Sequence, residues 1–132
     1  MPKWCDDGEN MVADTIFGTL SPVDPLYIGL YENGTEPAED DGLSDLTEQS
    51  GDGYARIQLD RGSWTITDDT AEYAQVTFTA AGAAWGNQYG YFITDAASGT
   101  TGRLVAVEHF SDGPYNVGDG DSVKITPKVT VS

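Results

Sequence analysis

The chain has 132 residues, a length typical of one domain, and its 22 acidic and six basic residues give a formal net charge of −16 at pH 7. This charge excludes most nucleic-acid binding, which relies on Lys and Arg to contact phosphates, and it disfavours anionic membrane surfaces. Because molar salt screens the self-repulsion of such a surface, the composition favours a halophilic setting over an ordinary acidic protein. There is no apolar run long enough to cross a membrane and no apolar signal-peptide core, so we expect synthesis in the cytoplasm without export by that route.

Residues 9–18 predict the only helix. Asn10 or Asp7 would cap its start, and Gly18 would end it. The side chains that recur at spacings of three and four, and so share one apolar face, are Met11, Val12, Thr15, Ile16 and Phe17. A helix of about three turns is too short to be stable alone, so it must dock on the domain or on a partner.

Trp4 precedes this helix within a polar stretch, and a large aromatic side chain near a terminus is often an interface anchor. We therefore expect residues 1–20 to form an attachment or oligomerisation arm, with Trp4, Met11 and Phe17 at the interface. Residues 21–132 would form the main domain.

Short runs of alternating apolar and polar residues predict strands along that domain. The runs are residues 26–31, 54–59, 64–66, 72–79, 88–94, 103–110 and 122–131. Pro127 lies within the last run, and because proline cannot donate to a ladder it implies an edge strand or a bulge. Seven to eight short strands separated by turns predict a mainly β fold, an antiparallel sandwich of the jelly-roll or immunoglobulin-like kind.

The long loop of residues 32–53 has no apolar periodicity and carries eight acidic residues with no Lys or Arg. Dense like charge keeps such a loop solvated, so it should face outward or meet a basic patch on a partner. Leu43 and Leu46 interrupt the polar sequence at a spacing that suits one helical turn. The loop is therefore either a solvated fringe or a segment that orders over a neighbouring subunit by burying these two leucines.

No catalytic constellation is recognisable. His109 lies in a predicted strand, where neighbours in sequence point to opposite faces, so Ser111 and Asp112 do not suggest a catalytic triad. Cys5 sits beside Asp6 and Asp7, whose charge disfavours a thiolate nucleophile. No enzymatic activity and no cofactor are therefore predicted.

Acidic turns and exposed aromatic residues leave two binding alternatives open. Among the carboxylate clusters, Asp119 and Asp121 are the least poor candidates for calcium, which favours oxygen ligands, although the default is a solvated turn. Trp64 and Tyr115 are candidates for stacking on sugar rings, but Trp and Tyr are equally common in cores and interfaces. Solvent-exposed, clustered Trp64 and Trp85 would favour a glycan site.

An ordered set of short motifs resembles a family of small proteins encoded by tailed prokaryotic viruses, commonly labelled tail-fibre or head-decoration proteins. The motifs are LYIGLY (26–31), GDGYAR (51–56), VTF (76–78), WG (85–86), YGYFITDA (89–96), RLVA (103–106) and VGDGDSV (117–123). The resemblance covers roughly residues 12–131. It departs from the family pattern in a longer acidic loop and in GYFI where members read GIF.

Physical reasons support the motif residues independently. Gly53 before Tyr54 allows a sharp entry into a strand, and Arg56 should pair with an acidic residue and hold the loop. Trp85 and Gly86 suggest a corner that fills one end of the sandwich, and Gly118 with Asp119 suggests a tight turn before the last strand.

The resemblance implies a virion structural protein without enzymatic activity. The leading hypothesis is a capsid decoration or cement subunit of a virus with a halophilic host, which would contact the major capsid protein or other virion proteins and copies of itself, with a trimer as the expected state. The alternative is a tail-fibre or glycan-binding receptor module of the same virion.

Overall fold

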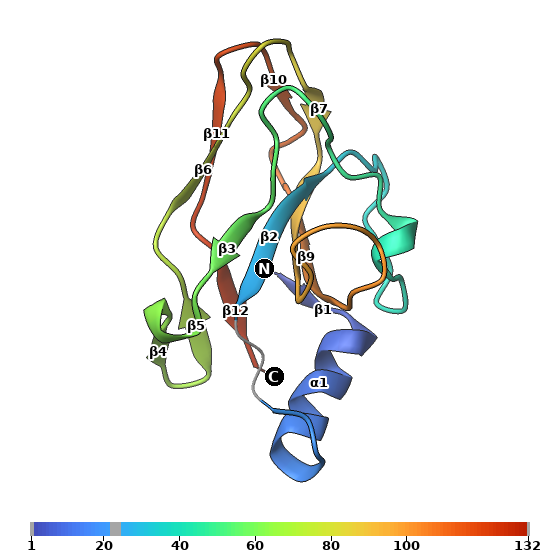
Figure 1. The fold of residues 1–132 in the computed structure, drawn as a ribbon, viewed down its shortest axis with the longest axis vertical. Helices are drawn as coiled ribbons and strands as arrows, with labels where there is room; N and C mark the ends of the chain where they lie inside the picture. Colours follow the sequence, from blue (N-terminus) through green and yellow to red (C-terminus); the bar gives the residue numbers. More distant parts are fainter. Residues whose placement is uncertain (1, 22–24, 132) are drawn as a thin grey trace.

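The computed structural model describes residues 2–21 and 25–131, and within them antiparallel strands form two layers with one α-helix at the lower end (Figure 1). Twelve strands are present in this part of the chain: β1 (Lys3–Trp4), β2 (Leu26–Tyr31), β3 (Ile57–Leu59), β4 (Thr65–Thr67), β5 (Thr70–Glu72), β6 (Val76–Thr79), β7 (Gly86–Gln88), β8 (Gly90–Thr94), β9 (Leu104–His109), β10 (Tyr115–Val117), β11 (Ser122–Ile125) and β12 (Lys128–Thr130). The helix is α1 (Asp6–Phe17), and two 3₁₀ turns are η1 (Leu43–Asp45) and η2 (Arg61–Ser63). The prediction of a mainly β, antiparallel, sandwich-like fold with one short N-terminal helix is confirmed.

The first layer is a five-stranded sheet in the order β1-β9-β8-β2-β3. Its centre pairs Leu30 of β2 with Tyr91 of β8, and Ile93 of β8 with Ala106 of β9. Every residue of β8 is buried, because this strand lies at the centre of the sheet and is covered on both faces.

The second layer is a long ribbon that bends in the middle. β6 pairs with β11, and β5 pairs with β12 on one side and β4 on the other. The continuous strands expected at residues 72–79 and 122–131 are each broken, and the break at Pro127 matches the absence of a proline N–H. Across the break, the Tyr73 amide donates to the Pro127 carbonyl at 2.9 Å.

Two elements begin at other residues than expected, and two short strands were not predicted. The helix begins at Asp6 rather than residue 9 and is preceded by Cys5, which makes no side-chain cap; Asn10 and Asp7 lie inside the helix. Instead, the Asp6 amide donates to the Glu39 carbonyl of the acidic loop at 2.8 Å. β1 and β10 span two and three residues, too few to show a period of two, and β3 starts only at Ile57 because residues 54–56 run outside the ladder.

Helix α1 packs directly on β9 through Gly8. A β-carbon placed at Gly8 would lie 2.2 Å from the carbonyl oxygen of Val105, so only glycine allows this approach. Met11 is buried on the same side of the helix, whereas Ile16 and Phe17 near its end are exposed. The helix is therefore held at its first turns and leaves its last turn in solvent.

This contact predicts an unusual response to Gly8→Ala. In an exposed helix, replacing glycine with alanine stabilises by about 1 kcal/mol. Here we expect a loss of about 1–3 kcal/mol in the free energy of unfolding, because the methyl group overpacks against β9. Urea denaturation of both proteins measures it; an increase in stability would show that α1 does not pack on β9 this closely.

Two apolar clusters lie on opposite faces of the five-stranded sheet. The larger lies between the layers and includes Ile28, Leu30 and Ile93; the smaller lies on the outer face and includes Tyr31, Phe92 and Leu43. Leu43 comes from η1 in the acidic loop, so this loop covers the outer face of the sheet. Leu43 is 4% exposed within its own chain, which corrects the expectation that it stays in a solvated fringe or packs on a neighbouring subunit. Leu46 is half-buried against the same cluster.

Candidate binding surface

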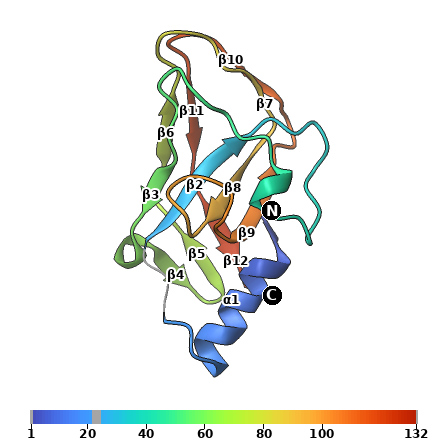
Figure 2. The same cartoon turned by 45° about the vertical axis from the view of Figure 1, so that its right-hand side comes forward.

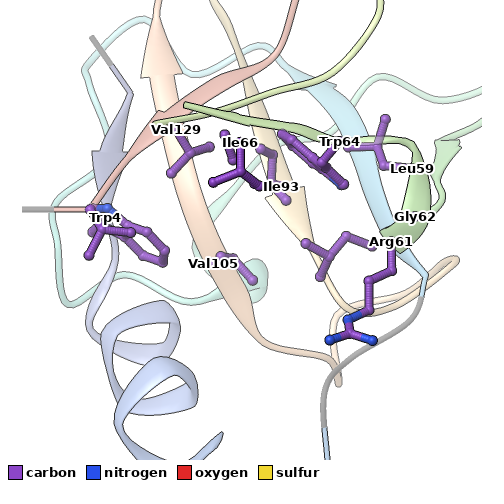
Figure 3. Close-up of a pocket in the computed structure, with 12 residues that line it drawn as sticks. Trp4, Leu59, Arg61, Gly62, Trp64, Ile66, Ile93, Val105 and Val129 are labelled. Carbon is purple, nitrogen blue, oxygen red and sulfur yellow. The ribbon is translucent and has the colours of Figure 1, made fainter. Parts of the chain in front are cut away.

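An apolar groove opens between the two layers at the end of the molecule that carries α1 (Figure 3). It encloses about 550 Å³, a volume within the range of about 300–1,000 Å³ common for binding pockets. The term apolar groove refers below to the hollow lined by Trp4, Leu26, Leu59, Arg61, Gly62, Trp64, Ile66, Ala71, Ile93, Val105, Val129 and Val131.

The floor and the walls come from both layers. Ile93 and Val105 of the five-stranded sheet and Val129 of the second layer are buried and form the floor. Trp4 and Trp64 stand on opposite sides, with Ile66 between them, and the guanidinium of Arg61 lies away from this aliphatic centre (Figure 3). The Trp4 indole N–H donates to the Thr130 carbonyl at 2.7 Å, which ties β1 to β12 beside the groove.

The groove continues along α1. Two shallower hollows share Trp4 with it: one is lined in part by Met11, Thr15 and Ile16, and the other by Ile16, Phe17 and Val131. Figure 2 shows α1 at the same end of the molecule as β12, β5 and β4. The exposed apolar side chains of the last helical turn therefore extend the groove.

The family-like motif residues Tyr54 and Arg56 form a partly buried network with Glu48 of the acidic loop. The Tyr54 hydroxyl accepts from the Leu30 amide at 2.9 Å and donates to Glu48 Oε2 at 2.6 Å. Arg56 contacts both carboxylate oxygens of Glu48, at 2.9 and 2.7 Å, and donates to the carbonyls of Ala96 and Gly99. Burial and the hydrogen bond to Glu48 raise the pKa of Tyr54 above its usual value, so the tyrosine stays protonated as the donor.

Other motif residues support turns at the opposite end. Gly53 and Gly86 both have positive φ, which is 86° at Gly53. A β-carbon added to Gly53 would lie 3.1 Å from Cβ of Ala81. Trp85 is buried, and its indole N–H donates to the Asp52 carbonyl at 3.0 Å. The Gly118 amide donates to Asp121 Oδ2 at 3.0 Å, and Asp119 accepts from the Gly82 amide at 3.0 Å.

The weak calcium candidates are thus engaged in turns. Asp121 accepts the Gly118 amide within its own turn, which is the ordinary role of aspartate in a tight turn. Asp119 accepts the Gly82 amide, which joins this turn to a second one that is distant in sequence. In the part of the chain that is described, no three His, Cys, Asp or Glu side chains are grouped so as to hold a metal ion.

The predicted interface residues fall into two groups. Trp4 and Phe17 line the apolar groove and its extension, and Phe17 is 88% exposed. Met11 and Leu43 are instead buried in the chain's own clusters, although Met11 also reaches one hollow along α1, and Leu46 is half-buried against the cluster of Leu43.

The candidate sugar-stacking residues do not form one site. Trp64 lines the apolar groove and packs edge-on against Tyr73, whereas Tyr115 belongs to β10 at the other end of the molecule (Figure 1). Trp85, the proposed partner of Trp64, is only 6% exposed. The exposed, clustered tryptophan pair that would favour a glycan site is therefore absent.

The single cysteine, Cys5, and the single histidine, His109, are both engaged in packing within the domain. Burial raises the pKa of the Cys5 thiol to about 12, so the thiolate needed for nucleophilic chemistry is not populated near neutral pH. His109 Nδ1 lies 3.0 Å from the Tyr31 hydroxyl, and its ring stacks near those of Tyr31 and Tyr89.

Sequence reasoning missed three residues of this surface. The sequence pattern placed Ile66 and Val131 in strands and Ile16 on the docking face of the helix. In the structure the Ile66 and Ile16 residues are each 66% exposed, and Val131 is 52% exposed. Ile66 sits between threonines in an edge strand whose three residues are all exposed, and this isolated apolar residue in a polar run was the available signal.

None of the helices among the described residues is long and apolar enough to span a bilayer. A search of curated proteins finds no match. A family model does match residues 3–131, and its description is podophage GP4 fiber I protein gp80. Since this match covers nearly the whole chain, the protein belongs to the podophage GP4 fiber I protein gp80 family.

Proposed function

We propose that this chain is a structural subunit of a viral fibre, which acts by contacts with other virion proteins and with copies of itself. The family match carries the proposal, since it names a fibre protein. It favours the tail-fibre alternative over capsid decoration. The apolar groove supports an assembly role, because soluble proteins rarely expose contiguous apolar surface without a partner.

A glycan-binding receptor module is less well supported. Sugar sites need polar groups that fix the hydroxyls. The lining of the apolar groove is dominated by aliphatic side chains and contains one charged residue, Arg61. Its chemistry suits apolar side chains of a protein better than a carbohydrate. We likewise propose that the subunit has no enzymatic role and needs no cofactor.

The location of this chain in the virus particle tests the proposed fibre function. Antibody raised against the purified chain should label the fibres of purified virions in electron micrographs, and mass spectrometry should find the chain in fibre-containing fractions. Labelling of the capsid surface would instead support decoration, and absence from purified virions would refute a structural role of either kind. A trimer of the purified chain, measured by sedimentation equilibrium, is the expected self-association.

The acidic surface predicts a strong dependence of stability on salt. With a net charge of −16, we expect the melting temperature to rise steeply between low and molar NaCl, as self-repulsion is screened within about 3 Å at 1 M. A thermal melt monitored by circular dichroism measures this. A melting temperature that stays constant over the range would count against adaptation of the host to high salt.

A further inference from the structure

The exposed large apolar side chains of this protein are concentrated at one place. Among the described residues, five such side chains are exposed: Ile16, Phe17, Ile66, Tyr115 and Val131. Four of them line the apolar groove or its extension along α1, and only Tyr115 lies elsewhere. Single exposed apolar residues are ordinary, but a contiguous patch over a buried aliphatic floor marks an interaction site.

The charges around this patch are predominantly negative. Helix α1 carries Asp6, Asp7, Glu9 and Asp14 with no Lys or Arg, and Glu9 lines the hollow that joins Phe17 to Val131. On the other side, the Val131 amide donates to the carbonyl of Asp69, which places the acidic β4–β5 turn next to the groove. Of the groove-lining residues, Arg61 is the one cation, and it already has an interaction of its own.

These charges distinguish between possible occupants. A symmetric pair of copies would bring the same surface together, so each acidic α1 would face the other. Like charges placed opposite each other across an interface cost several kcal/mol, whereas opposite charges favour association. Charge complementarity therefore selects a partner that is apolar at its centre and basic at its edges.

We propose that the apolar groove binds a peptide segment with an apolar core flanked by Lys or Arg, contributed by a different protein of the virion. This inference rests on the proposed fibre function and names the partner of that assembly. Apolar side chains of the segment would fill the space between Trp4 and Trp64 over Ile93, Val105 and Val129. Its basic flanks would lie against α1 on one side and the β4–β5 turn on the other.

The binding test uses synthetic peptides and the full chain. The probe has a Leu-Val-Leu core with two Lys on each side, and the controls replace either the core with Ser or the Lys with Glu. Fluorescence anisotropy of labelled peptide gives the Kd at physiological salt. We expect each control peptide to bind at least about tenfold more weakly than the probe, because both the core and the flanks contribute.

Two protein variants locate the site. Phe17→Ser and Ile66→Ser remove exposed side chains and should leave circular dichroism and melting temperature unchanged, while the Kd of the probe rises about tenfold or more. Tyr115→Ser, at the far end, is the matched control and should change the Kd less than about twofold. Equal binding by all variants would show non-specific attraction to an acidic protein and overturn the proposal.

Two further results separate this inference from the fibre assignment. If sedimentation shows a self-associated wild type that Phe17→Ser and Ile66→Ser dissociate, the groove is an interface between copies and the proposal is wrong. If virions carrying Phe17→Ser and Ile66→Ser incorporate the chain into fibres at the wild-type level, the groove has no assembly partner although the fibre function stands. Loss of incorporation together with weaker binding of the probe supports both.

Discussion

Arg56→Ala should lower the free energy of unfolding by about 3 kcal/mol, since it removes a buried guanidinium and leaves the partly buried Glu48 carboxylate without its charged partner. The Arg56 side chain is 3% exposed and makes two contacts with Glu48, which is 25% exposed. The variant also removes the guanidinium 5.2 Å from the centre of the Phe92 ring. Urea denaturation measures the change, and hydrogen exchange should show faster exchange of the acidic loop.

Arg103→Ala is the matched control for this prediction. Arg103 also pairs with a carboxylate, Asp95 at 3.0 Å, but its side chain is 40% exposed. The Asp95 side chain is 14% exposed, but it keeps the Arg103 backbone amide as a donor at 2.7 Å when the guanidinium is removed. This variant should therefore cost about 1 kcal/mol at most, as for a pair that solvent reaches. Equal losses for the two arginine variants would mean that burial of the Arg56 network does not hold the loop.

Leu43→Ala should cost about 2–4 kcal/mol, the range for deleting a well-packed buried leucine. Leu43 is 4% exposed and lies in the cluster that contains Tyr31, Phe92 and Val107. Leu46→Ala, at a half-buried neighbour, should cost less. The urea midpoints of both variants measure the difference. An unchanged midpoint for Leu43→Ala would show that Leu43 does not pack on the sheet, and that the acidic loop is solvated or contacts another subunit.

Local pattern was sufficient to predict much of the fold. β2 matches residues 26–31 at both ends because its apolar alternation is uninterrupted, and β9 lies within one residue of its predicted span at either end. Gly18 follows the end of α1 as expected, and its amide donates to the Asp14 carbonyl. These features depend on residues adjacent in sequence, which a reading of periodicity uses directly.

The acidic loop could not be predicted because its order depends on distant contacts. Glu48 is held by Tyr54 and Arg56, and the backbone N–H of Gln49 donates to the Leu30 carbonyl at 3.2 Å. The sequence pattern left two roles open, a solvated fringe or a segment that orders over a neighbouring subunit, whereas Leu43 packs in the same cluster as Phe92 of its own chain. Five of its eight acidic residues are exposed, namely Glu36, Glu39, Asp40, Asp45 and Asp52.

The binding surface was only partly predictable for the same reason. Trp4 and Phe17 stand out in the sequence as large aromatic residues near a helix that is too short to be stable alone. Ile66 and Val131 belong to different strands, and only the pairing of β4 and β12 with β5 brings them to one end of the second layer. The N-terminal arm expected at residues 1–20 is also joined to the sandwich, since β1 pairs with β9 and Cys5 is fully buried.

Point variants are therefore better probes of attachment than removal of residues 1–20, which would delete an edge strand and part of the core. The most direct test of the account is a cryo-electron microscopy reconstruction of the virion that resolves this chain. We predict that the chain lies in a fibre, with Trp4, Phe17 and Ile66 covered by a different virion protein that places Lys or Arg beside α1. A chain found in the fibre with this surface open to solvent, or a chain absent from the particle, would contradict it.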